Sequence, residues 1–133
     1  MFSFVQKTIK PFLIIFGIIT AILVLVAVSP KSWVENLLKL EFFEEYKILI
    51  QHWGILIFLV GLFMFLSAFI TAWRFPIILF ATIEKIFIVL LYIVNLQYKF
   101  SEGFSLAAVI DSIIVIYFLI YLFVSWKQSH KKE

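Results

Sequence analysis

Four blocks of almost uninterrupted apolar residues dominate the chain, with short polar stretches between them. The blocks cover residues 12–28, 53–73, 76–96 and 104–126, and each is close to the roughly 20 residues that an α-helix needs to cross a bilayer. None alternates apolar and polar positions as barrel strands do, so a helical bundle is the remaining form that can span a membrane. The pattern predicts an all-α polytopic membrane four-helix bundle, folded as a single integral membrane domain over residues 1–133.

The longest polar stretch, "PKSWVENLLKLEFFEEYK", lies between the first two blocks. Ser32 and Glu35 have the spacing of a capping box, which favours a helix start. Apolar side chains recur in the segment at close to helical spacing, at Trp33, Leu37, Leu40 and Phe43. We expect a short amphipathic interfacial helix on the outer surface. Two other interpretations stay open: a plain connection packed on the bundle, and a lid over a cavity that opens outward.

Composition agrees with this pattern. The chain is 65% hydrophobic and 14% charged, with a mean hydropathy of +1.14, whereas soluble domains are roughly 45–50% apolar and about 25% charged. The absence of cysteine excludes disulfides, thiol chemistry and Cys-based zinc sites. The net charge of +3 arises largely from lysines just after the last block, so we expect a lipid bilayer as partner and no nucleic acid.

Basic residues are distributed unequally between the two sides of the predicted bundle. Four spans place the termini and the second turn on one side, with Lys7, Lys10, Arg74, Lys127, Lys131 and Lys132. The other side carries Lys31, Lys39, Lys47 and Lys99. The positive-inside rule predicts that both termini are cytoplasmic. Three tryptophans, Trp53, Trp73 and Trp126, fall at block ends, as interfacial anchors do.

The second and third blocks are separated only by "WRFP", which predicts an antiparallel hairpin with Pro76 in the first turn of the third helix. In the second block, Gly54, Gly61 and Ala68 recur at intervals of seven residues. Small side chains on one stripe let a neighbouring backbone approach closely, as helix packing in lipid requires. Helix packing is therefore the expected role, with a hinge or a ligand groove as the alternative.

The third block contains a glutamate and a lysine near its middle, where charge costs roughly 2.5–3.5 kcal/mol per residue on insertion scales. At 100° per residue, Glu84, Lys85, Tyr92 and Asn95 fall on one arc of the helix. We expect this polar stripe to face the interior of the bundle.

The fourth block supplies a partner, because Asp111 lies among small residues about a third of the way across. In an antiparallel pair of helices, Lys85 and Asp111 differ in depth by about 7 Å, which a lysine stem can bridge. A triad of Glu84, Lys85 and Asp111 carries a formal charge of −1, which implies either a protonated carboxyl or a bound cation. The alternatives are groups that only specify helix pairing, a proton or ligand site, and groups left near water.

His52 opens the second block, where it is either an interfacial hydrogen-bonding group or a pH-sensing or ligand-contacting one. We assign Glu84, Lys85, Asp111, Tyr92, Asn95 and His52 to a candidate ligand or proton site. The chain has no G-x-S-x-G elbow or glycine-rich phosphate loop, and we predict no catalytic residue, metal or cofactor.

The motifs "QHWG", "AFITAWRFP" and "IEK" resemble small four-helix bacterial membrane proteins of the DoxX-like and BphX-like kind. The resemblance covers residues 51–85. It implies a multi-pass protein of the bacterial cytoplasmic (inner) membrane that acts as an accessory component, and it carries over no catalytic residue.

Three functions follow as hypotheses. The first is an accessory subunit or binder of a lipophilic partner, with an intramembrane polar site and a possible homodimer or larger membrane complex. The second is a dimeric proton-coupled carrier of a small cation or hydrophobic amine, in which Glu84 is shared by proton and substrate. The third is a membrane enzyme acting on a lipid through His52, Glu84 and Asp111, although helix rise places His52 roughly 18–20 Å from Glu84.

Overall fold

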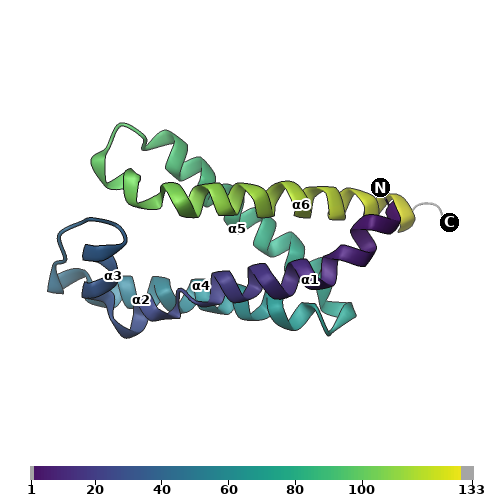
Figure 1. The fold of residues 1–133 in the computed structure, drawn as a ribbon, viewed down its shortest axis with the longest axis horizontal. Coiled ribbons are helices and arrows are strands. Elements are labelled where there is room, and N and C mark those ends of the chain that lie inside the picture. The colour runs from purple at the N-terminus through teal and green to yellow at the C-terminus, as the bar shows by residue number, and fades with distance from the viewer. Residues whose placement is uncertain (1, 130–133) are drawn as a thin grey trace.

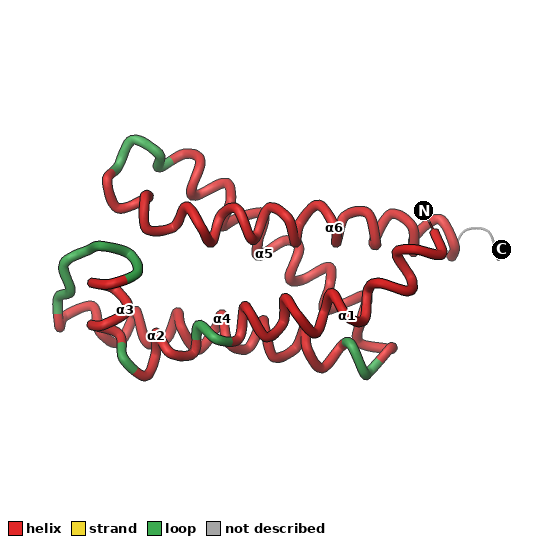
Figure 2. The backbone as a smooth tube through the Cα atoms, in the orientation of Figure 1, coloured by secondary structure: helices red, strands yellow, loops and turns green. Residues whose placement is uncertain are grey.

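The protein, described over residues 2–129 in a computed structural model, consists of helices joined by short turns, with no strand among those residues (Figures 1 and 2). In chain order the elements are α1 (Phe2–Ala21), α2 (Val24–Val28), α3 (Pro30–Asn36), η1 (Glu44–Tyr46), α4 (Lys47–Ser67), η2 (Thr71–Trp73), α5 (Arg74–Val94), η3 (Lys99–Phe104) and α6 (Ser105–Ser129), where η denotes a short 3₁₀ helix. The predicted all-α fold is confirmed.

Within residues 2–129, four helical stretches are long and apolar enough to cross a membrane. They are Phe4–Val28, Glu44–Ser67, Thr71–Val94 and Lys99–Lys127, with mean hydropathies of 2.2 to 2.9. Large apolar side chains such as Ile48 and Phe87 point outward along these stretches. The exposed apolar surface is that of a multi-pass integral membrane protein, whose outer face meets lipid rather than water.

The long helices form two layers (Figure 1). In the first layer α1 and α2 run alongside α4, and in the second α5 runs alongside α6. α5 leaves the turn after α4 and crosses obliquely to reach α6, so α4 and α5 diverge along their length. The N-terminal and C-terminal ends of the described chain lie at the same end of the molecule, as an even number of spans requires.

The first layer depends on close backbone contact at glycines. A Cβ added to Gly17 would lie 2.8 Å from the amide nitrogen of Phe65, and one on Gly54 would lie 2.8 Å from that of Ala27. A Cβ on Gly61 would collide with the amide nitrogen of Ala21. The small-residue stripe of α4 therefore faces α1 and α2, where any side chain would push the backbones apart.

The two layers share one apolar core, near the end that holds the termini. Its buried members come from all four long helices: Ile9, Leu13, Val60, Met64, Ala68, Ile78, Ala81, Ile114 and Phe118. α1 and α6 also meet there through polar and aromatic contacts, because the hydroxyls of Thr8 and Tyr117 are 2.6 Å apart. The ring of Phe12 stacks on Tyr117 with 3.8 Å between centroids. The layers are thus tightly joined at this end.

The layers touch again at the opposite end. A Cβ on Gly103 would lie 2.5 Å from the Cα and the carbonyl oxygen of Leu38, so η3 packs directly against the segment that follows α3. Trp53 of α4 and Phe104 are in edge contact, with ring centroids 6.0 Å apart. Contacts at both ends therefore enclose a region where α4 and α5 diverge.

The helix that carries the first apolar block begins earlier than the block itself. α1 begins at Phe2 rather than near residue 12, so that Lys7, Lys10 and Pro11 lie inside the helix. The helix is then interrupted at residues 22 and 23, where tighter hydrogen bonds such as Leu23 N to Thr20 O replace the α-helical ladder. The helix can include these lysines because their long side chains can reach a polar interface.

The predicted turn at "WRFP" is placed a few residues too late, although Pro76 lies in the first turn of α5 as predicted. α4 covers Lys47–Ser67 instead of residues 53–73, so Trp53 lies within the helix and not at its start. The chain turns at residues 68–70, and Arg74 opens α5. The guanidinium of Arg74 donates to the carbonyls of Ser67 and Ala68 at 3.1 and 2.8 Å, which satisfies acceptors that the end of α4 leaves free.

The interfacial helix is shorter than expected. α3 ends at Asn36, and Lys39 has a left-handed backbone with φ of 56°, which breaks any helical continuation. Ser32 does not cap this helix, because Ser29 precedes it and Pro30 is its first residue. The segment 37–43 packs as an irregular connection.

Replacing Gly61 with Ala is expected to destabilise the protein by about 1–3 kcal/mol, because the added methyl group meets backbone rather than a movable side chain. Thermal unfolding in detergent measures the loss. Ile55→Ala, on the exposed face of the same helix, is the control and is expected to change stability by about 0.5 kcal/mol or less. An unchanged melting temperature for Gly61→Ala would mean that α1 and α4 are not in backbone contact.

Candidate functional site

The polar groups near the middle of α5 lie at the edge of the shared core. Lys85 follows the buried Ala81 by one helical turn, and Asp111 precedes the buried Ile114 by about one turn on α6. α5 and α6 are packed side by side, and Lys85 therefore faces α6 directly. The predicted contact between Lys85 and Asp111 across this antiparallel pair of helices is confirmed.

Lys85 and Asp111 form a short ion pair. The Lys85 Nζ donates to Asp111 Oδ1 at 2.6 Å, with side-chain exposures of 3% for the lysine and 14% for the aspartate. A buried ammonium without a partner is strongly unfavourable, and a short charge-assisted hydrogen bond compensates for part of that penalty. This pair joins α5 to α6.

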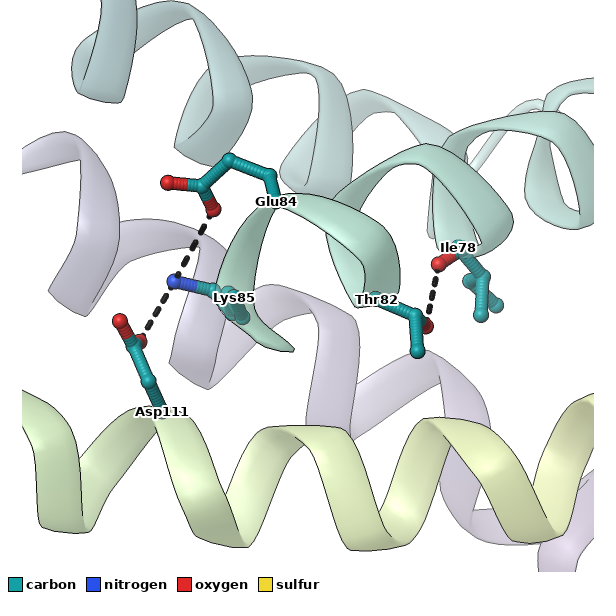
Figure 3. Close-up of polar contacts among 5 residues, drawn as sticks. All are labelled: Ile78, Thr82, Glu84, Lys85 and Asp111. Atoms are coloured by element: carbon teal, nitrogen blue, oxygen red, sulfur yellow. Dashed lines mark hydrogen bonds and ion pairs between the residues drawn. The ribbon is translucent and has the colours of Figure 1, made fainter. Parts of the chain in front are cut away.

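Glu84 is held much less tightly. Its Oε2 lies 3.9 Å from Lys85 Nζ, which is an ion pair but not a hydrogen bond (Figure 3). Among the residues that the structure describes, this oxygen is the buried side-chain polar atom that lacks a hydrogen-bond partner. Figure 3 shows the other carboxylate oxygen pointing away from the ammonium group. Lys85 is thus bonded to Asp111, and the Glu84 carboxylate can still accept a further polar group.

Two other polar side chains near the site, one buried and one half-buried, are satisfied locally. The Thr82 hydroxyl donates to the Ile78 carbonyl at 2.6 Å, as Figure 3 also shows. Ser112, next to Asp111, donates to the Ala108 carbonyl at 2.7 Å. These hydroxyls bond within their own helices, so neither completes the coordination of Glu84.

Glu84 lines an apolar hollow between the diverging helices, which we call the α4–α5 cleft. The cleft has a volume of about 390 Å³. Its walls include Leu56, Leu59 and Phe63 of α4, and Phe80, Glu84 and Ile88 of α5. Because α4 carries no charged residue beyond Lys47, Glu84 is the charged group of this cleft. The arrangement combines an apolar volume with one under-coordinated carboxylate.

Tyr92 and Asn95 lie in a different hollow, further along α5. Together with Phe100 and Phe104 they line a volume of about 240 Å³ beside η3. Asn95 donates its side-chain amide to the Leu91 carbonyl at 2.7 Å, which caps the end of α5. Ile88 borders both hollows, so the polar stripe continues along the helix without bringing these two residues to the ion pair.

His52 is exposed on the outer face of α4 and does not line the α4–α5 cleft, although its neighbour Trp53 does. Gln51 on the other side donates to the Ala27 carbonyl at 3.0 Å and fastens α2 to α4. The sequence-based set is therefore divided into three places: the triad, the hollow of Tyr92 and Asn95, and the surface position of His52. No three His, Asp or Glu side chains within residues 2–129 converge as metal ligands would.

The cleft itself was not predictable from the sequence. Its walls are leucines, isoleucines and phenylalanines, which any membrane helix contains, and helical periodicity does not say which of them border an empty volume. The one available signal was the position of Glu84 next to Lys85, since adjacent residues point about 100° apart and cannot both face α6.

Comparison of the chain with protein families, characterised proteins and solved structures finds no match. The resemblance to DoxX-like and BphX-like proteins stays a prediction. The functional interpretation consequently depends on the geometry of this chain alone.

The losses in stability caused by substitutions at Lys85 and Asp111 are expected to be strongly non-additive. Lys85→Met leaves two carboxylates without a cation and is expected to cost about 3–5 kcal/mol. Asp111→Leu costs less, since Lys85 keeps Glu84 within 3.9 Å. The double variant loses less than the sum of the two. Thermal unfolding of all three in detergent completes the cycle.

The exposed pair of Lys47 and Glu44, 3.6 Å apart, is the matched control. Its side chains are 50% and 73% exposed, so the same cycle there is expected to give a coupling of about 1 kcal/mol or less. If the stability losses of Lys85→Met and Asp111→Leu were strictly additive, the two side chains would not form a buried ion pair.

Proposed function

We propose that this protein is an integral membrane protein that binds a lipophilic partner in the α4–α5 cleft, with Glu84 as the polar contact. The observation that carries the proposal is the under-coordinated Glu84 carboxylate in the wall of an apolar hollow of about 390 Å³. Ionisable groups are kept at membrane depth mainly where they serve binding, transport or proton transfer. An accessory role within a homodimer or a larger membrane complex is compatible with this binding function.

The shape of the cleft supports a ligand that arrives through the bilayer. Leu56, Leu59 and Phe80 are all partly exposed on the outer surface of the helices, where a lipid-embedded protein meets acyl chains. At the far end, Trp53 and Phe104 are in contact, and both also line a neighbouring hollow. We therefore propose that the ligand enters from the lipid side, past these exposed apolar residues.

We further propose the bacterial cytoplasmic membrane as the location, with both termini in the cytoplasm. The ammonium group of Lys10 lies 5.0 Å from the centre of the Phe69 ring, so a lysine of α1 and the turn before α5 are at the same end. Arg74 and Lys127 belong to that end too. This accumulation of basic residues supports the orientation.

A cleft-filling substitution is expected to abolish lipid retention. Leu56 and Ile55 are 48% and 47% exposed, but only Leu56 lines the cleft. In native mass spectrometry from phosphatidylcholine nanodiscs, the wild type and Ile55→Trp are expected to retain a bound lipid, whereas Leu56→Trp loses it. A wild type that is entirely free of adducts would contradict the proposed binding function.

Membrane orientation can be tested by cysteine labelling. The chain contains no cysteine, so the protein has no native thiol that reacts with a maleimide. Ser32→Cys, on the exposed α3, is expected to react in intact cells with a maleimide that does not cross membranes. Lys127→Cys, exposed near the end of α6, is expected to react only after the cells are lysed. The reverse pattern would place the termini outside.

A further inference from the structure

We infer that the α4–α5 cleft selects a cationic amphiphile, a single-chain lipophilic amine whose ammonium group binds Glu84 while its hydrocarbon chain fills the cleft. This inference rests on the proposed function and adds the chemical class of the ligand. Three independent observations carry it: the charge of the site, the coordination of Glu84 and the lining of the cleft.

The charge at the site is unbalanced. Glu84, Lys85 and Asp111 together carry a formal charge of −1, and Lys85 is the cation within ion-pair distance of both acids. α4 contributes no charged side chain opposite them, since its sequence from Ile48 to Ser67 contains none. A ligand with one positive charge neutralises the site, whereas an anionic ligand adds a second unpaired negative charge in a low-dielectric region.

The adjacent lysine does not block a cation. Lys85 Nζ is 2.6 Å from Asp111 and 3.9 Å from the nearer Glu84 oxygen, so its charge is already compensated on the α6 side. Figure 3 shows one oxygen of the Glu84 carboxylate directed away from Lys85. Oε2, the buried oxygen without a hydrogen-bond partner, faces Lys85. In the inferred complex the ammonium group binds the other oxygen, on the side of the carboxylate away from Lys85.

The rest of the cleft accepts only apolar groups. Around Glu84 the walls consist of aliphatic and aromatic side chains, and Phe63, Phe80 and Trp53 are among them. Aromatic faces attract an ammonium group through their quadrupole in addition to packing against a chain. A hydrated inorganic cation gains neither contact, so an amine that carries its own hydrocarbon is the better match.

The test compares two ligands with the same chain, dodecylamine and dodecanol, in titrations against the full-length protein in phosphatidylcholine nanodiscs, with empty nanodiscs subtracted. Wild type is expected to bind dodecylamine at least about tenfold more tightly than dodecanol. Both head groups can donate a hydrogen bond to the Glu84 carboxylate, but only the ammonium group adds an ion pair with it. Glu84→Gln is expected to remove that preference. Glu102→Gln is the matched control, since it removes one exposed carboxylate of η3 outside the cleft and is expected to keep the preference.

The possible outcomes distinguish lipophilic binding in the cleft from selectivity for an amine. Equal binding of both compounds to the wild type, abolished by Leu56→Trp, would overturn the amine selectivity and leave the lipophilic cleft in place. An unchanged amine preference in Glu84→Gln would likewise overturn the assignment of Glu84. No saturable binding of either compound would contradict both the proposed function and this inference.

Discussion

A lysine ammonium in the middle of an apolar helix constrains the whole arrangement, because an unpaired charge at that depth costs several kcal/mol. Lys85 meets the constraint with Asp111 at 2.6 Å, which sets the rotation of α5 and its register against α6. Adjacent residues of a helix point about 100° apart, so the same rotation turns Glu84 away from α6 and toward α4. One ion pair therefore decides both how two helices dock and where the second carboxylate points.

The cleft exists because α4 has a stronger attachment elsewhere. Its glycines bring its backbone against α1 and α2, and close backbone packing is the main source of helix association where lipid already solvates apolar side chains. α5 is attached to α6 by Lys85 and Asp111, so neither partner of the α4–α5 pair is free to close on the other. The contacts at the two ends, through Tyr117 and through Gly103, keep the layers together without filling the space between them.

Helix content and the four spans were predictable because length and apolarity are the properties that a bilayer imposes. The meeting of Lys85 and Asp111 was predictable too, since helix rise and antiparallel topology fix relative depth. The turn after α4 was not, because residues 68–70 are as apolar as the helices and Arg74 marks the turn only through its hydrogen bonds. The separation of Tyr92 and Asn95 from the triad depends on where η3 packs, which periodicity along one helix does not encode.

In the proposed function the ligand enters the α4–α5 cleft from the bilayer, and its measured affinity then depends on its partitioning into the bilayer. A ligand that reaches Glu84 through the acyl chains equilibrates with the membrane phase, so occupancy follows its mole fraction in the bilayer and not its aqueous concentration. Two amphiphiles with identical contacts at Glu84 then differ in apparent aqueous dissociation constant by the ratio of their partition coefficients. Each additional methylene that is buried in the bilayer, at about 0.8 kcal/mol, changes that apparent constant without touching the protein.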